Sequence, residues 1–282
     1  MDTVKIISKI RLEISKYFKA NNKTYAIFGK SMGIDSSLVA GLLSNVPDVK
    51  PVGVINPIKS DPDDEKIAKI VLKYFKIPFI KINLTKEYER LADKLYLDDN
   101  LINQVNEIKG RQDYKVKNNV LLETKSFALA NIKLRLRMIT LYHIAKIMDG
   151  IVIGTGNFSE HMTGFWTLHG DVGDFCPIMN LYKTEVYDLA KKLKVPSESI
   201  NAIPSDGAGF TKKGTDEDQL GLTYDKLDMV IKDYLTGNTK NQILNKFNFE
   251  KSKTNKALAK IINFKYKRKL PITISRQKLG LD

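Results

Sequence analysis

Residues 25–44, which read YAIFGKSMGIDSSLVAGLLS, join a short apolar strand to an apolar helix through a polar turn. The pattern predicts the strand over Tyr25–Phe28 and the helix over Ser36–Ser44. In such a turn, backbone N–H groups and the helix N-terminus can hold phosphate oxygens. Gly33 would let the backbone approach a ligand closely, and Asp35 adds a carboxylate that could face a metal. The stretch therefore predicts a phosphate-binding loop at the end of a buried strand.

Strands and helices alternate on both sides of this loop. The sequence predicts further strands at 52–55, 79–82 and 151–153, and helices at 63–75, 127–148 and 184–193. Such alternation predicts an α/β fold with a parallel central sheet flanked by helices. Residues 224–264 add C-terminal helices, and residues 204–217 are expected to form a loop of functional length. Because no linker marks a boundary, residues 1–282 are expected to form a single domain.

Composition narrows the classes of function. Apolar residues make up 43% of the chain, which is enough for a sizeable core. The single cysteine, Cys176, excludes a disulfide framework and a cysteine-rich zinc site. There is no signal peptide and no apolar run of the ~18 residues that a membrane helix needs, so a cytoplasmic protein without membrane contact is expected. The net charge of +14 suits a phosphorylated ligand or nucleic acid, although solvated helix faces explain much of it.

Two known phosphate-loop patterns can be compared with this turn. A Walker A loop requires a glycine five residues before Gly29, where Thr24 stands, so that pattern does not fit. The S-G-G-x-D-S loop of the ATP pyrophosphatases fits better, because residues 31–36 read SMGIDS, with Met32 in place of the first glycine. Taken alone, this match leaves open an ordinary strand-to-helix turn whose aspartate caps the helix.

Other segments resemble the ammonia-dependent NAD synthetase family, in the family's order and over nearly the whole chain. They are SFALANIKLRLRM (126–138), GTGNFSEHMTGFWTLHGDVG (154–173), PIMNLYKTEV (177–186), PS (204–205), GTDEDQLGLTYDKLD (214–228) and FKYKRKLP (264–271). The resemblance implies the Rossmann-like ATP pyrophosphatase fold and a carbon–nitrogen ligase. In its reaction the nicotinate carboxylate of deamido-NAD attacks ATP, pyrophosphate leaves, and ammonia displaces AMP to give NAD. The chain has no room for a glutamine-hydrolysing segment, so ammonia is the expected nitrogen source.

The resemblance also implies residue roles. ATP binding falls to Gly29, Lys30, Ser31, Met32, Gly33, Ile34, Asp35, Ser36, Thr155, Lys183 and Ser205. Lys183, Asp35 and Ser205 are the implied catalytic residues, and Asp35 and Glu160 the implied Mg²⁺ ligands. Deamido-NAD binding falls to Arg135, Asp174, Tyr266 and Lys267, in a site that crosses a homodimer interface in the family. Phe127 matches an aromatic residue near the nucleotide, but a core position suits it equally.

Two positions depart from the family pattern. A side chain at Met32 would crowd the pyrophosphate, so weaker ATP binding with retained activity is expected. Leu168 stands where many members have a substrate-binding lysine. These departures leave two alternatives open: another adenylating amidotransferase on the same fold, or a catalytically weakened relative that binds nucleotide or nucleic acid. Retention of Asp35, Glu160, Lys183 and Ser205 favours the enzyme, because a binding protein has no evident need for all four.

Overall fold

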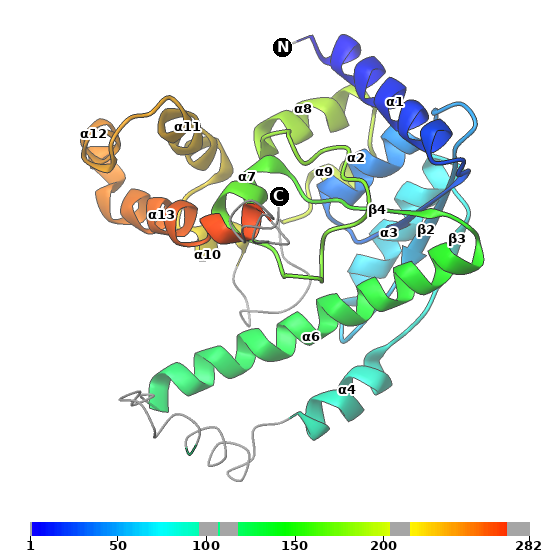
Figure 1. The fold of residues 1–282 in the computed structure, drawn as a ribbon, viewed down its shortest axis with the longest axis horizontal. Helices are drawn as coiled ribbons and strands as arrows, with labels where there is room; N and C mark the ends of the chain where they lie inside the picture. The colour runs from blue at the N-terminus through cyan, green and yellow to red at the C-terminus, as the bar shows by residue number, and fades with distance from the viewer. Residues whose placement is uncertain (1, 96–106, 108–117, 204–214, 270–282) are drawn as a thin grey trace, which may run out of the picture.

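A four-stranded parallel sheet forms the centre of the molecule (Figure 1). The structure is a computed structural model that describes residues 2–95, 107, 118–203 and 215–269. The strands lie in the order β3-β2-β1-β4, and each pairing is parallel. Their bounds are Tyr25–Gly29 for β1, Lys50–Ile55 for β2, Phe79–Lys81 for β3 and Ile151–Ile153 for β4. The predicted α/β fold with a parallel central sheet is confirmed.

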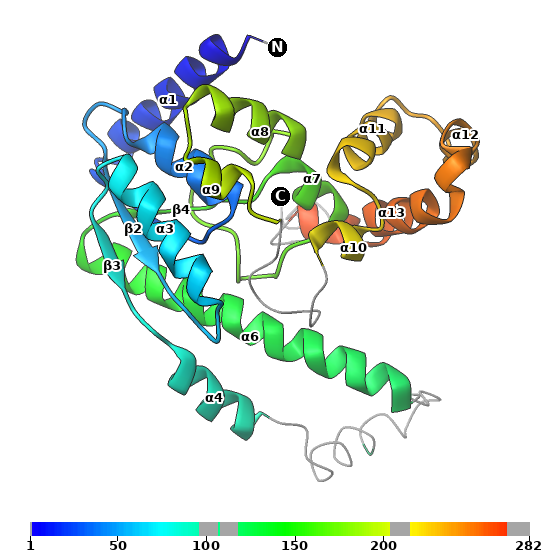
Figure 2. The ribbon, with the colours of Figure 1, turned by 180° about the vertical axis from the view of Figure 1, so that it is seen from behind.

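Helices cover both faces of this sheet (Figure 1, Figure 2). On one face lie α1 (Thr3–Ala20), α2 (Ile34–Leu43), α3 (Pro62–Tyr74) and α8 (Lys183–Lys192). On the other face lies α6 (Asn118–Ile147), with α4 (Thr85–Lys94) packed against it. Among the described helices, none is long and apolar enough to cross a membrane.

The side chains of β1 explain why both faces are covered. Ala26 and Phe28 are fully buried in the cluster that includes α2 and α8. Ile27 points to the opposite face and is fully buried against Leu141 and Ile144 of α6. Successive residues of a strand face opposite sides, so an uninterrupted apolar run needs a helix layer on each side.

A second hydrophobic cluster lies beside the sheet and consists of helices alone. Its helices are α10 (Asp216–Leu220), α11 (Tyr224–Leu235), α12 (Lys240–Lys246) and α13 (Lys251–Asn263), followed by the short η2 (Lys265–Arg268). Both views show α11, α12 and α13 standing apart from the sheet, beyond α7 (Phe158–Thr163) and α8 (Figure 1, Figure 2). Met162 of α7 is buried in this second cluster, whereas Val186 of α8 belongs to the cluster of the sheet.

Most predicted element bounds agree with the structure to within two residues, and larger differences occur among the helices. The helix expected at 127–148 begins earlier, at Asn118. The helical stretch expected over 224–264 is divided into α11, α12 and α13. The first division is at Gly237, whose φ of +88° ends a helix. Short elements at η1 (Asn248–Glu250) and α9 (Ser197–Ile200) are additional. Of the loop expected at 204–217, residues 204–214 lie outside the described residues.

The carboxyl ends of β1 and β4 lie next to each other, and this adjacency creates the crevice in which the site forms. From β1 the chain passes through α2 to β2, while β4 pairs with the opposite edge of β1. Parallel sheets bind ligands at such a topological switch point. The loop of residues 30–33 and the segment of residues 154–157 follow these two strands and face the same crevice.

Gly173 gives a test of how tightly the crevice wall is built. A Cβ at this position would lie 2.6 Å from both Gly154 N and Val152 O, which are backbone atoms that cannot turn away. We expect Gly173→Ala to lower the free energy of unfolding by about 3 kcal/mol, the upper range for overpacking. Denaturant unfolding measures this loss. Gly237→Ala is the control, because a Cβ there meets nothing within 4 Å and costs only the ~1 kcal/mol of a left-handed backbone. Equal losses in the two variants would contradict the predicted clash.

Candidate functional site

The loop between β1 and α2 is closed by hydrogen bonds from its own serines. Gly33 N donates to Ser31 Oγ at 3.1 Å, and Ser36 Oγ donates to Gly33 O at 3.0 Å. Ser31 N lies 3.4 Å from Ser36 Oγ. Gly33 forms the N-cap of α2 without a side-chain cap, so the start of this helix faces the crevice. A helix N-terminus that lines a crevice suits a phosphate group.

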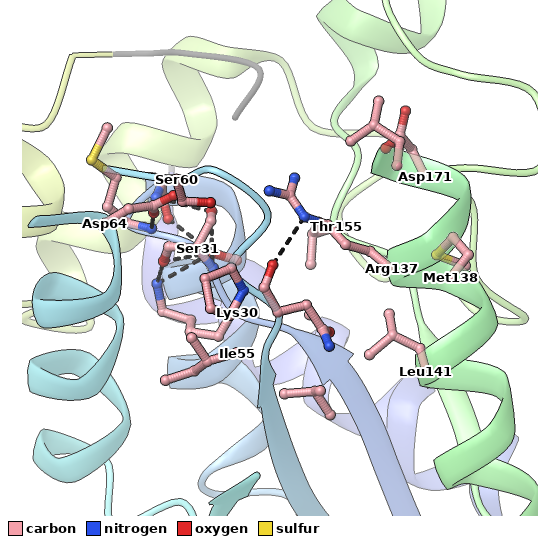
Figure 3. A pocket seen from close by; sticks show the side chains of 18 of the residues that line it. Lys30, Ser31, Ile55, Ser60, Asp64, Arg137, Met138, Leu141, Thr155 and Asp171 are labelled. Atoms are coloured by element: carbon pink, nitrogen blue, oxygen red, sulfur yellow. Dashed lines mark hydrogen bonds between the residues drawn. The ribbon is translucent and has the colours of Figure 1, made fainter. Parts of the chain in front are cut away.

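Lys30 and Met32, the two unusual residues of this loop, both make defined contacts, and Figure 3 shows Lys30 beside Ser31. Lys30 is only 4% exposed, and its ammonium contacts Ser31 O and Ser36 Oγ. Burial lowers the pKa of Lys30 to about 7, although the carboxylates of Asp64 and Asp35 oppose the shift. Met32 N donates to Asp64 Oδ1 at 2.6 Å. A carboxylate from the first turn of α3 thus already occupies one anion-binding amide of the loop.

A cavity of about 190 Å³ opens beside the loop, between the strand ends and α6 (Figure 3). Its apolar wall includes Ile55, Met138 and Leu141. Arg137 reaches into it from α6, and its Nε donates to Asn56 O at 3.3 Å. Arg135, which the family resemblance implies binds deamido-NAD, has an exposed side chain whose Nε donates to Leu168 O at 3.2 Å, outside this cavity. Residues two apart on a helix point about 200° away from each other, so only one of the two arginines can face the cavity.

A larger cavity of about 970 Å³ adjoins the first, and a buried ion cluster lies in its wall. The ammonium of Lys183 contacts Asp35 Oδ2 and lies 3.8 Å from Glu160 Oε1. Asn157 Nδ2 donates to Asp35 Oδ1 at 3.0 Å. The side chain of Lys183 is 3% exposed, against 15% for Asp35 and 19% for Glu160. The structure therefore brings together the predicted catalytic lysine and both predicted metal ligands.

Burial makes the charges of this cluster interdependent. It raises the pKa of Glu160 to about 8, with a further contribution from the nearby Asp35 carboxylate. Burial alone would lower the pKa of Lys183, but Asp35 and Glu160 outweigh it, so the pKa lies above its usual range. The ammonium also lies 5.0 Å from the centre of the Tyr224 ring. Two carboxylates that share one buried ammonium form a place where positive charge is stabilised.

Local sequence explains how these side chains converge. Asp35 lies in the first turn of α2, and Lys183 is the first residue of α8. Glu160 closes a capping box with Asn157 at the start of α7: Glu160 N donates to Asn157 Oδ1 at 3.0 Å, and Asn157 N donates to Glu160 Oε2 at 3.1 Å. A lysine at a helix start is electrostatically unfavourable on its own. The two carboxylates offset that cost for Lys183.

Asp228 of α11 fixes the start of α8 from the helical cluster. Its carboxylate accepts hydrogen bonds from Thr184 N at 3.0 Å, from Thr184 Oγ1 at 2.9 Å and from Ser159 Oγ. Ser159 Oγ in turn accepts from Lys183 N at 2.9 Å. Asp228 is 1% exposed. The sequence analysis gave it no role, although it ends the TYDKLD run that carries part of the resemblance.

The remaining predicted site residues fall into three groups. Thr155 lines both cavities, and Phe127 and Lys267 line the larger one. Asp174 lines neither, since its carboxylate accepts from Val152 N at 2.9 Å and from Tyr142 OH at 3.1 Å. Tyr266 also lines neither, and Ser205 lies outside the described residues. Asp171, which the sequence analysis passed over, lines both cavities.

Comparisons with known proteins agree with this geometry. A family model described as NAD synthase matches residues 6–271. The chain is 36% identical to the NH(3)-dependent NAD(+) synthetase of Finegoldia magna, over 94% of this chain and 98% of that one. It is 33% identical to the NH(3)-dependent NAD(+) synthetase of Methanocaldococcus jannaschii, over 95% of each chain. Among solved structures, the NMN synthetase from Francisella tularensis matches with a TM-score of 0.72 and 26% identity, over 98% of this chain and 99% of that one.

We predict that Asp228 affects the reaction rate indirectly, because its hydrogen bonds to Ser159 and Thr184 hold the backbone at Lys183 in place. Asp228→Asn removes the charge that holds Thr184 N and Ser159 Oγ, so we expect a stability loss of about 2 kcal/mol and an approximately tenfold lower rate of AMP release from ATP. Asp233→Asn is a matched control on the same helix, because Asp233 is 8% exposed and pairs with Lys246 away from the cavities. We expect it to lose stability but keep its rate. Equal rates in the two variants at a temperature where both are folded would contradict this role.

Proposed function

This chain belongs to the NAD synthase family, and on that premise we propose that it converts deamido-NAD to NAD with ATP and ammonia. The observation that carries the proposal is the buried Lys183–Asp35–Glu160 cluster in the wall of a cavity that the phosphate loop also lines. Such a cluster places positive charge and metal-binding carboxylates beside the phosphates of a nucleotide. The alternatives of another amidotransferase or a non-catalytic binding protein are not favoured, because the relatives at 31–36% identity are NAD synthetases.

The two adjoining cavities could each bind one of the two substrates. Ser31, Gly33, Ser36 and Thr155 line both cavities, so the phosphates of ATP would lie at the junction. The smaller cavity, with its apolar wall and Arg137, would take the adenosine. The larger cavity, which contains Lys183, would take deamido-NAD with its carboxylate towards the α-phosphate. Holding the two reactants side by side supplies much of the rate enhancement that such a reaction needs.

The chemistry proceeds in two balanced steps. A carboxylate oxygen of the nicotinate forms a bond to the α-phosphorus, and the bond from that phosphorus to the bridging oxygen breaks to release pyrophosphate. Ammonia then forms a bond to the carboxyl carbon, the bond to the AMP oxygen breaks, and the nitrogen loses a proton. The ammonium of Lys183 would stabilise the negative charge that builds up on the phosphates in the first step.

Asp35 and Glu160 suit a magnesium ion. Mg²⁺ is usually held by one or two carboxylates together with substrate phosphates and water, and these two side chains converge on one cation. Among the described residues, no cluster of three or more acidic, histidine or cysteine side chains could hold a metal ion by itself. When bound, Mg²⁺ would supply positive charge beside the phosphates. Burial and the Asp35 carboxylate raise the pKa of Glu160, whereas the Lys183 ammonium opposes this shift, so positive charge nearby favours the charged carboxylate.

The test is an assay of purified protein with ATP, Mg²⁺, ammonium and deamido-NAD, followed by chromatography of the products. NAD and AMP in equal amounts are the expected result. Nicotinate mononucleotide is the second substrate to include, because the relative from Francisella tularensis is an NMN synthetase and its structure matches with the high TM-score given above. The ratio of kcat/KM for the two substrates decides between them. If folded protein made no AMP with either deamido-NAD or nicotinate mononucleotide, the proposed reaction would be overturned.

Lys183 is predicted to be essential for AMP formation. Lys183→Met removes the ammonium and leaves two buried carboxylates without it, so we expect the rate to fall by about 10²- to 10³-fold. Lys191→Met is the control, because Lys191 is an exposed lysine of the same helix that lines neither cavity. A loss smaller than tenfold in Lys183→Met would rule out this role.

Apolar side chains on the solvent face of α6 support the homodimer that the family resemblance implies. Ile139 is 65% exposed and Ile147 is 71% exposed, and Tyr142 is exposed on the same helix. Large exposed apolar side chains gathered on one element are typical of a protein interface. We propose that a second copy of this chain covers them.

If α6 forms the dimer interface, a charged side chain introduced on its exposed apolar surface should separate the two copies. Ile139→Asp would place a carboxylate in the buried interface, so we expect light scattering to give the mass of a monomer. Met229→Asp on α11 is the control, because Met229 is also an exposed apolar residue, at 52%, and we expect the dimer to persist. A wild-type protein that is monomeric at micromolar concentration would contradict the proposal.

A further inference from the structure

Helix α13 directs part of its positive charge into the larger cavity. Lys256 and Lys260 line this cavity and lie four residues apart, so they are neighbours on one face of the helix. Lys251 and Lys253 belong to the same helix but are exposed and line neither cavity. The lysines of α13 therefore have two different environments, and only one pair is directed towards a ligand.

Of the two lysines, Lys260 has less negative charge nearby to offset its positive charge. Its side chain is half-buried, and within the described part of the chain it forms no ion pair. Burial lowers the pKa of Lys260, and the neighbouring Lys256 lowers it further. A partly desolvated cation beside a second cation is unfavourable unless an anion joins them.

The other charges around the pair do not supply that anion. The ammonium of Lys267 adds positive charge, since it is held by Trp166 O and by Gly164 O at 2.8 Å. Asp218 lines the same cavity and is the acidic group whose pKa Lys256 helps to lower, after its hydrogen bonds to Thr215. Lys256 is thus partly balanced by Asp218, whereas the charge that shifts the pKa of Lys260 is the positive charge of Lys256. The Asp171 carboxylate, which lines the same cavity, raises the pKa of Lys267 instead.

The surroundings of the pair suit a nucleotide. Trp166 and Phe264 line the same cavity, and the ammonium of Lys267 lies 5.3 Å and 5.2 Å from their ring centres. Aromatic rings beside ammonium groups can hold a base or a sugar while the lysines hold a phosphate. We propose that Lys256 and Lys260 form a phosphate-binding subsite for a nucleotide that occupies the larger cavity. The inference rests on the proposed function in one respect: the proposed function identifies deamido-NAD and ATP as the nucleotides to test.

The experiment compares Lys260→Gln with Lys251→Gln, which removes the same charge from the same helix outside the cavity. Calorimetry measures binding of deamido-NAD, ATP and inorganic pyrophosphate without turnover. Loss of a charge-assisted hydrogen bond to phosphate predicts an approximately tenfold higher Kd for Lys260→Gln and little change for Lys251→Gln. An increase for deamido-NAD alone assigns the subsite to its phosphates, and an increase for ATP and pyrophosphate assigns it to the leaving group.

Two further variants keep the result interpretable. Lys260→Arg retains the charge and is expected to bind as the wild type does, and Lys256→Gln is expected to show a smaller increase in Kd because Asp218 already balances Lys256. Equal Kd values for Lys260→Gln and Lys251→Gln with every ligand would overturn the subsite. A protein that shows the increase in Kd but makes no NAD would overturn the proposed reaction and leave the subsite in place.

Discussion

A buried ammonium shared by two carboxylates is the constraint on which the rest of the site depends. Lys183 can meet Asp35 and Glu160 only if α2, α7 and α8 all begin at the same edge of the sheet. The parallel sheet places the starts of α2 and α7 there, because β1 and β4 end side by side. Asp228 then holds the start of α8 from the helical cluster. The two hydrophobic clusters are thus joined through the functional groups themselves.

The phosphate loop shows how a departure from the family pattern can be accommodated. Met32 replaces a glycine, yet its amide still faces an anion, which is the carboxylate of Asp64 at 2.6 Å. Lys30 lies beneath the loop and contacts Ser36 Oγ at 3.2 Å, so positive charge stays close to where phosphates would bind. This loop is closed by its own serines and by Asp64, so phosphate oxygens that bound its amides would have to replace some of these contacts. Weaker ATP binding, as expected from Met32, remains a prediction.

Several of the positively charged side chains line the two cavities. The net charge of +14 suggested nucleic acid or solvated helix faces as readily as a nucleotide. Within the described residues, Lys30, Lys183, Lys256, Lys260 and Lys267 line the two cavities. Lys251 and Lys253 remain exposed, as the simpler interpretation of the C-terminal charge predicts. The lysines of α13 are thus divided between a cavity wall and the exposed surface.

The sequence by itself determined the α/β fold, the turn between β1 and α2, and the choice of Asp35, Glu160 and Lys183, three side chains that meet in the structure. Apolar runs and glycine-containing turns are local signals, and the motif run is long enough to be specific. Only the tertiary structure decided which residues face the cavities. Asp64 is 32 residues from Met32, and Asp228 is 44 residues from Thr184. It also placed Arg137 rather than Arg135, and Asp171 rather than Asp174, in the cavity walls. The physical reason is that the direction of a side chain depends on helix phase and long-range packing, which spacing along the chain does not specify.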